Sequence, residues 1–359
     1  SNKSENVMSR AYLQIDFLKN FQFKTNFSAD YYNTHEITHQ NSQFGDAAGF
    51  NGRSTKENYR NIGLNFNQLL TYDNQFGKHS VNVLLGHETF KKNFNYIEAT
   101  RTGFPFGGLE ELATASTMES STSYRDEYRI EGYLSRVKYN FDDKYYIAGS
   151  YRRDGSSRFA KENRWGNFWS VGGSWRVNQE AFLAGINWIN DLKVKASYGE
   201  QGNDRLLDGV GNALYYGYQS FYATANNYSY SGFRVTQLAN EELQWEVSEN
   251  LNAGIEFRFF DRLYGELNYF EKGSSQLLFR LPLPQSTGIG EIYQNTGAMV
   301  NKGVEGRLGY DIIRTENLRW NLELTATTFS NEFTELPFEE RIVGSKQWKV
   351  GKSLYDYYI

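Results

Sequence analysis

Residues 247–259, VSENLNAGIEFRF, decide the fold class because apolar and polar side chains alternate along them. One parity carries the apolar residues Val247, Leu251, Ala253, Ile255, Phe257 and Phe259, and the other carries Ser248, Asn250, Asn252, Glu256 and Arg258, with Gly254. A period of two predicts a β-strand with one oily face and one wet face. On a helix the apolar residues would form no stripe. Because similar segments recur along the chain, we expect the wall of a barrel with lipid outside and water inside.

The composition is compatible with such a barrel. The 359 residues include 27 Tyr and 26 Phe, and the net charge of -4 is too small to indicate a nucleic-acid partner. No stretch approaches the roughly 20 apolar residues of a membrane helix, but a tilted spanning strand needs only about 9–11. The chain has no cysteine, which excludes disulfides and thiolate metal sites within it. Residues 1–4 carry no signal peptide, so for an exported protein we expect the leader to be removed or to lie outside this sequence.

The same alternation predicts twelve antiparallel strands, an even number that suits an array of hairpins. We expect them near residues 11–18, 21–31, 62–66, 81–85, 133–141, 145–151, 169–177, 192–198, 247–259, 263–269, 300–312 and 318–326. A short helix within 178–191, capped by Asn178, is also expected. The tail 352–359 does not read as a closing strand, so we expect a section of wall from a larger barrel.

Connection lengths mostly alternate between short and long. We expect short turns at 19–20, 73–78, 142–144, 260–262 and 313–317, and longer loops at 33–56, 92–125, 154–164, 200–242 and 282–294. Outer-membrane barrels have short periplasmic turns and long extracellular loops, whereas a soluble sandwich has no reason to sort loop length by end. Aromatic residues at two short turns, Phe141, Tyr145, Tyr146, Phe259 and Phe260, fit an interfacial girdle.

Motifs from residue 129 onward resemble the barrel of SusC/RagA-type TonB-dependent transporters of Bacteroidetes. The first lies in 145–159, YYIAGSYRRDGSSRF, and runs on through NRWG (163–166), SWRV (174–177), EAF (180–182) and LKVKASYGEQGN (192–203). Further matches follow in family order: LQWE (243–246), NTG (295–297) with NKGVE (301–305), and GKSL (351–354). One such motif is weak, but four in order are specific.

The resemblance implies an all-β, antiparallel transmembrane barrel in the outer membrane that imports a nutrient, commonly a glycan or a peptide. It implies four partners: a SusD-like surface lipoprotein, TonB acting through an N-terminal region, outer-membrane lipid, and an oligosaccharide or peptide substrate. It implies no cofactor and no catalytic or metal-binding residues. Family barrels have about 22 strands around a plug. We therefore expect residues 1–359 to be a partial barrel domain, without the plug.

An aromatic loop is the best candidate for substrate contact. Aromatic faces stack on sugar rings and on apolar groups of peptides, and tyrosine hydroxyls form hydrogen bonds; the alternative is that the rings pack the loop on itself. The residues are Tyr215, Tyr216, Tyr218, Phe221, Tyr222, Tyr228, Tyr230 and Phe233. A second set should line the wet interior: Asn250, Asn252, Glu256, Arg258, Glu266, Asn268, Glu305, Arg307, Asn321 and Glu323.

Other chemical motifs favour structural interpretations. His35 and His39 would suit a metal only on a helix, and they fall at a strand end and loop. Arg152, Arg153, Asp154 and Arg158 could hold an anion, but residues 154–157 are typical of a turn. Three alternatives stay open: a passive porin-like channel, a barrel-based outer-membrane enzyme or adhesin, and a soluble secreted sandwich.

Overall fold

The computed structural model describes residues 1–208, 211–228 and 230–358. It is an all-β chain that divides into two compact units. The first unit comprises residues 1–15, 23–69 and 87–131, and the second comprises residues 16–22, 70–86 and 132–359. Among the described residues, no helix is long and apolar enough to cross a membrane.

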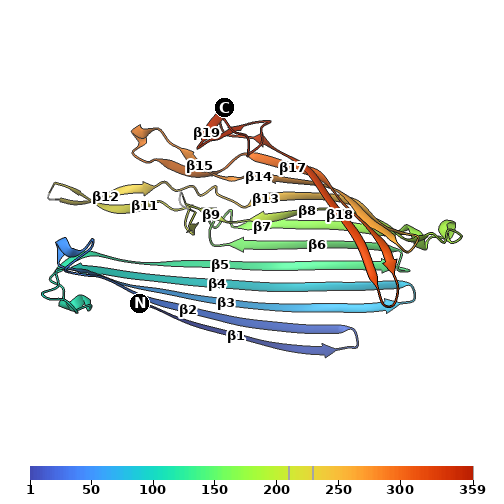
Figure 1. Cartoon of the computed structure of the whole chain (residues 1–359), viewed down its shortest axis with the longest axis horizontal. Helices are drawn as coiled ribbons and strands as arrows, with labels where there is room; N and C mark the ends of the chain where they lie inside the picture. The colour runs from blue at the N-terminus through green and yellow to red at the C-terminus, as the bar shows by residue number, and fades with distance from the viewer. Residues whose placement is uncertain (209–210, 229, 359) are drawn as a thin grey trace. The chain divides into compact units, whose positions relative to one another are not determined.

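Twelve strands form one antiparallel sheet in the order β1-β2-β3-β4-β5-β6-β7-β8-β13-β14-β17-β18, which confirms the predicted number and fold class (Figure 1). Their bounds are β1 Asn2–Phe17, β2 Phe21–Gln40, β3 Arg53–Phe76, β4 His79–Thr102, β5 Thr117–Phe141, β6 Tyr145–Ser156, β7 Trp165–Arg176, β8 Ile189–Asn203, β13 Glu246–Phe259, β14 Leu263–Ser275, β17 Ala298–Arg314 and β18 Arg319–Glu335. Consecutive strands are neighbours except where the short strands of loop hairpins intervene, as expected for a hairpin array.

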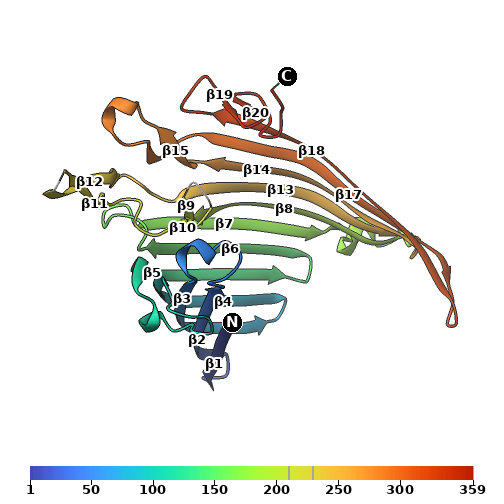
Figure 2. The same cartoon turned by 60° about the vertical axis from the view of Figure 1, so that its left-hand side comes forward.

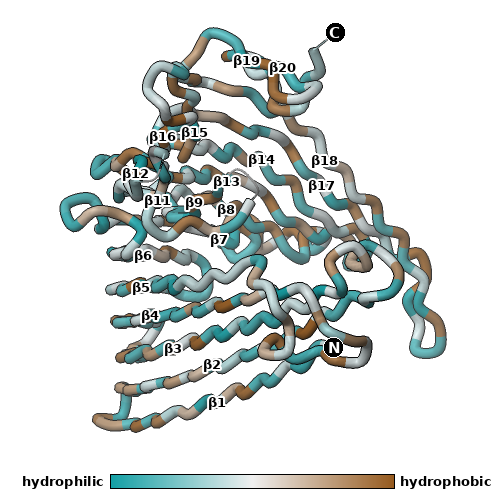
Figure 3. Tube along the Cα trace, turned by 90° about the vertical axis from the view of Figure 1, so that its left-hand side faces the viewer, coloured by the Kyte–Doolittle hydropathy of each residue, from teal (hydrophilic) through white to brown (hydrophobic). Residues whose placement is uncertain are grey.

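In the second unit the predicted oily face is continuous across strands. Ile255 on β13 pairs with Val194 on β8 and with Leu267 on β14, and Val194 pairs with Trp175 on β7. Ile255 is 38% exposed and Leu267 is 49% exposed, so no second layer covers this face within the described residues. Figure 3 shows the resulting alternation of hydrophobic and hydrophilic positions along β13, β14 and β17. This exposure contradicts the soluble sandwich, in which the same side chains would be buried.

Short turns and long connections of the second unit lie at opposite ends of its strands (Figure 2). The turns at 142–144, 260–262 and 315–318 are short, and aromatic rings gather beside two of them. The ring centroid of Phe141 lies 6.3 Å from that of Tyr145, and the Tyr145 centroid lies 6.4 Å from that of Trp175. At the next turn Trp188 stacks on Phe260 at 5.4 Å. These rings match the predicted interfacial girdle.

The strands of the first unit are much longer than predicted. The expected loop 33–56 is wrong, because β2 continues to Gln40 and β3 begins at Arg53; the expected loop 92–125 is wrong, because β4 ends at Thr102 and β5 begins at Thr117. The loops that remain, 41–52 and 103–116, bury Ala47, Phe104 and Ala115. These strands are longer than the about 9–11 residues that span a membrane. In the part of each strand that lies beyond the membrane both faces can be polar, so its sequence resembles that of a loop.

Other boundaries also differ from prediction. β1 begins at Asn2 rather than Ala11, and residues 154–156 continue β6 instead of forming a turn. The helix expected at 178–191 is two 3₁₀ turns, Val177–Gln179 and Ala181–Leu183, without side-chain caps. Asn178 does not cap a helix, because its amide donates to the Asn190 carbonyl at 3.2 Å.

The longest predicted loops contain hairpins of their own. The 200–242 segment holds β9 (Leu206–Leu207) with β10 (Ala213–Leu214) and β11 (Phe221–Asn227) with β12 (Tyr230–Gln237). The loop predicted near 282–294 is a hairpin of β15 (Leu278–Pro282) and β16 (Glu291–Asn295) around a 3₁₀ turn, Gln285–Thr287. After β18 come β19 (Glu340–Val343) and β20 (Lys346–Lys349). The tail 352–358 adds no strand to the main sheet, and Ile359 of the predicted tail lies outside the described residues.

Candidate functional surfaces

The wet face of the second unit is hollowed and carries several polar side chains. A cavity of about 510 Å³ is lined by residues of β4 to β8, β13 and β14, among them Asn82, Lys138, Lys195, Asn252 and Asn268. Asn250 and Asn252 also line a second hollow of about 730 Å³. These strands therefore present a concave surface with polar side chains, as predicted for the wet parity.

Ion pairs cross the strands of this wet face. Lys195 on β8 bonds to Glu256 on β13 at 2.6 Å and approaches Glu266 on β14 at 3.5 Å. Farther along, Arg307 bonds to Glu323 at 2.6 Å. Opposite charges on neighbouring strands stabilise a sheet by cross-strand pairing. The predicted interior residues Glu256, Glu266, Arg307 and Glu323 thus lie on one face, where Lys195 compensates the first two and Arg307 compensates Glu323.

A small core sits where the strands of the second unit meet the long connections. It contains Phe159, Phe168, Leu206, Leu243, Trp245 and Tyr293. The Trp245 indole donates to the Arg164 carbonyl at 2.8 Å. Gly202 is required beside this core, because a Cβ there would lie 2.0 Å from the Phe168 ring. The core fixes the base of the loop that carries the predicted aromatic residues.

A buried polar pair strengthens the same base. Arg158 donates from Nη1 to the Asp204 carbonyl at 2.9 Å, and its guanidinium lies 3.6 Å from the Asp204 carboxylate. Ser156 Oγ donates to that carboxylate at 2.6 Å. Three other residues were considered above as part of an anion site. Asp154 accepts a hydrogen bond from Arg152 Nε at 2.7 Å, and the Arg153 guanidinium lies over the Trp165 ring at 5.3 Å. These contacts stabilise loop and strand ends.

The structure separates the predicted aromatic residues into two groups. The first group packs on the base: the Tyr215 ring lies 5.2 Å from the Arg158 guanidinium, and Tyr216 contacts both Tyr215 and Phe221 edge-on. Tyr218 is half-buried, and its hydroxyl accepts a hydrogen bond from Gln219 at 2.9 Å. These rings order the loop, which is the structural alternative considered for them above.

The second group is exposed on the β11–β12 hairpin. Tyr222, Tyr228, Tyr230 and Phe233 are 64–100% exposed. Thr224 pairs with Phe233 and Tyr222 pairs with Val235, so Tyr222 and Phe233 share one face of the hairpin. An isolated two-stranded hairpin is marginally stable in water, so one that displays large rings is suited to contact another molecule.

The first unit carries an aromatic surface that the sequence analysis missed. Tyr59 on β3 lies 4.8 Å from Tyr96 on β4, and Tyr124 on β5 lies 5.2 Å from Tyr96 and 5.8 Å from Phe94. Phe94, Tyr96 and Tyr124 fell inside the expected loop 92–125. The signal was available, since Phe94 and Tyr96 alternate with Asn93, Asn95 and Ile97 and lie on the parity that Ser80 and Asn82 occupy lower on the strand.

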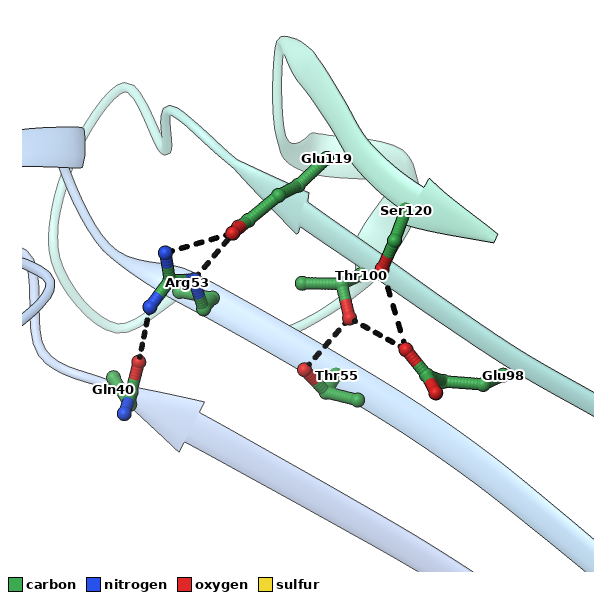
Figure 4. Close-up of polar contacts among 7 residues, drawn as sticks. All are labelled: Gln40, Arg53, Thr55, Glu98, Thr100, Glu119 and Ser120. Carbon is green, nitrogen blue, oxygen red and sulfur yellow. Dashed lines mark hydrogen bonds and ion pairs between the residues drawn. The ribbon is translucent and has the colours of Figure 1, made fainter. Parts of the chain in front are cut away.

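Two carboxylates border these rings. Tyr96 donates its hydroxyl to Glu98 at 2.8 Å and approaches Glu57 at 3.3 Å, and Tyr59 also donates to Glu57. Burial, and then the bond to Glu98, raises the pKa of Tyr96. Figure 4 shows that Glu98 also receives hydrogen bonds from Thr100 and Ser120. The surface is therefore aromatic and acidic.

The histidine pair lies on a strand. His35 and His39 are in β2, and the His39 ring nitrogen Nδ1 lies 2.7 Å from Ser54 Oγ, with the ring against Phe104 at 5.4 Å. Side chains four apart on a strand point to the same face but are separated by about 13 Å of chain. His39 thus contributes to loop packing.

Comparisons with known proteins agree with this architecture. The family described as "TonB dependent receptor-like, beta-barrel" matches residues 2–356. TonB-dependent receptor P3 of Formosa agariphila is 30% identical over 348 residues, which cover 93% of this chain and 34% of that protein. TonB-dependent receptor SusC of Bacteroides thetaiotaomicron is 28% identical over 301 residues, covering 80% of this chain and 28% of SusC. The chain thus spans about a third of the length of its curated relatives.

The structural comparison gives the same result. The RagAB peptide transporter structure aligns with a TM-score of 0.88 and 26% identity, covering 98% of this chain and 39% of the aligned chain. The resemblance to SusC/RagA-type proteins is confirmed, and the oily and wet faces described above are those of an outer-membrane barrel wall. The chain belongs to the TonB-dependent receptor-like β-barrel family.

Proposed function

We propose that the whole protein is a TonB-dependent importer of a glycan or peptide, and that residues 1–359 supply part of its barrel wall and extracellular loops. The observation that carries the proposal is the alignment of 98% of this chain with a RagAB peptide transporter chain at a TM-score of 0.88. The exposed oily face and the hydrated inner hollows of the second unit support it, because an importer needs lipid outside and water inside.

The partners follow from the same similarity. A SusD-like surface lipoprotein would deliver cargo, and TonB would supply energy through a region outside this sequence. The exposed residues Tyr222, Tyr228, Tyr230 and Phe233 are proposed to contact cargo, while Tyr215, Tyr216, Tyr218 and Phe221 hold the loop in place. Rings with hydroxyl groups suit either a sugar or a peptide. No enzymatic role is proposed, and the relatives' names as receptors and transporters support this view.

Uptake by living cells tests the proposal. Cells that express the full-length protein with its neighbouring lipoprotein would take up labelled oligosaccharides or peptides, and deletion of TonB should abolish uptake of one of these classes. Uptake that persists without TonB would support the passive channel instead. Binding without uptake, in cells with intact TonB, would support an adhesin.

A further inference from the structure

The aromatic and acidic surface of the first unit lies outside the buried core of the described residues. Its rings lie on strands β3, β4 and β5, and Tyr124 is 50% exposed. Along the wet parity of β4 the lower residues include Ser80 and Asn82, whereas three rings, Phe90, Phe94 and Tyr96, follow higher up with Glu88 and Lys92 among them. Apolar rings on a face that otherwise meets water form the kind of exposed patch that marks a binding site.

The negative charge of this surface indicates that it binds a cation. Glu57 and Glu98 share the Tyr96 hydroxyl as a donor, so two negative groups lie close together. Their described partners are the hydroxyls of Tyr59, Tyr96, Thr100 and Ser120. Within the described part of the chain, neither carboxylate forms a salt bridge. Like charges on neighbouring strands repel, and a cation placed between them would relieve that repulsion.

Nearby basic residues are engaged elsewhere. Arg53 holds Glu119 in a bidentate pair at 2.7 and 2.8 Å and also donates to Gln40 at 3.3 Å, as Figure 4 shows. Lys56 pairs with Glu111. Lys92 lies near Asp126, and its charge lowers the pKa of that carboxyl, which burial raises. None of these basic residues forms a salt bridge with Glu57 or Glu98 in the described part of the chain, so a cationic ligand can neutralise the two carboxylates.

We propose that Tyr59, Phe94, Tyr96 and Tyr124, together with Glu57 and Glu98, bind a cationic group of the cargo, an ammonium or a guanidinium. Ring faces attract such cations through their quadrupoles, and the carboxylates accept their N–H donors. A neutral sugar would use the rings but leave the two charges uncompensated. Among the described residues no group of three or more acidic or histidine side chains is placed to hold a metal ion, so a bare divalent cation fits less well.

This inference rests on the proposed role as an importer, but equilibrium binding can test it without transport. The purified full-length protein in detergent would be titrated by calorimetry with Gly-Arg-Gly amide and with the same peptide carrying citrulline, which replaces the charged guanidinium by a neutral group of similar shape. The arginine peptide should bind about tenfold more tightly, as expected for one added cation–π and carboxylate contact.

Variants assign the effect to this surface. Glu98→Gln should remove most of the preference for arginine, whereas Glu110→Gln, a matched loss of charge at an exposed residue of loop 103–116, should leave it unchanged. Tyr124→Leu, at a half-exposed ring, gives a second test if Glu98→Gln fails to assemble, and heat resistance on a gel verifies folding. Equal affinity for both peptides, or a preference that survives both variants, would overturn the inference. If the protein prefers the arginine peptide but cells show no TonB-dependent uptake, the proposed importer function is wrong and the binding inference stands.

Discussion

Replacing Ile255 by arginine tests the assignment of the oily face. Ile255 lies four residues from Leu251 and four from Phe259, so it is near the middle of the outward apolar run of β13. At about 3.4 Å per residue, each end of that run is about 14 Å away along the strand. An arginine at the bilayer midplane costs about 2–4 kcal/mol, which lowers the folding equilibrium constant roughly 30- to 700-fold.

The assay is guanidinium unfolding of the full-length protein in lipid vesicles, with heat-resistant migration on a gel as a check of assembly. Leu251→Arg, at the upper end of the run, should cost only about 0–1 kcal/mol because it lies near the interface. Asn252→Arg places the same charge on the wet face, where water solvates it. If Ile255→Arg unfolds at the same guanidinium concentration as Asn252→Arg, the proposed lipid-facing parity is incorrect.

Three further changes test the loop base by the same unfolding measurement. Arg158→Ala leaves the buried Asp204 without its cation and should cost about 3–5 kcal/mol; a cost below about 1 kcal/mol would show that the pair is solvated. Gly202→Ala forces a Cβ against Phe168 and should cost about 1–3 kcal/mol, so an unchanged midpoint would refute the close packing. Burial raises the pKa of Glu246, which lies at the loop end of β13. The folded state therefore holds this proton more tightly than the unfolded state, and the Glu246 contribution to stability falls as pH rises from about 4 through the folded pKa. Glu246→Gln should flatten that part of the pH profile, and an identical slope in both proteins would contradict this reasoning.

The sequence was sufficient to predict the strands that have one face in contact with lipid. Around Ile255 the alternation is strict, because lipid requires apolar side chains at every second position. The pairing of Ile255 with Val194 and Leu267 follows from that parity and from the short turn at 260–262. The same reasoning placed Glu256 and Arg307 on the wet face, but it did not predict the ion pairs that they form with Lys195 and Glu323.

Strand ends beyond the bilayer could not be found in this way. There both faces meet water or protein, so polar residues no longer signal a turn, and β2 to β5 read as loops where they are paired strands. Thr55 and Thr100, for example, face each other at 2.9 Å in a segment predicted as irregular. For the same reason Tyr96 and Tyr124 were missed, because no strand face is assigned to residues that are predicted to lie in a loop.

The aromatic loop was recognised by composition alone. Composition does not distinguish Tyr215, which packs on Arg158, from Phe233, which is exposed, because that difference depends on contacts with the base formed by Arg158 and Asp204. Assigning a role to each ring required the hairpin register and the position of the core. The residues proposed to contact cargo are therefore fewer than the eight in the predicted set.

Labelling single cysteines along β13 tests the central claim most directly. This chain contains no cysteine, so residues 251–259 can be replaced one at a time in a full-length protein whose other cysteines, if any, are removed. Each cysteine would carry an environment-sensitive fluorophore in vesicles that contain either a lipid-borne or a water-soluble quencher. Lipid-borne quenching should be strong at 251, 253, 255, 257 and 259 and weak at the residues between them, with the opposite order for the soluble quencher. Quenching without a period of two, or with the parities exchanged, would contradict the account.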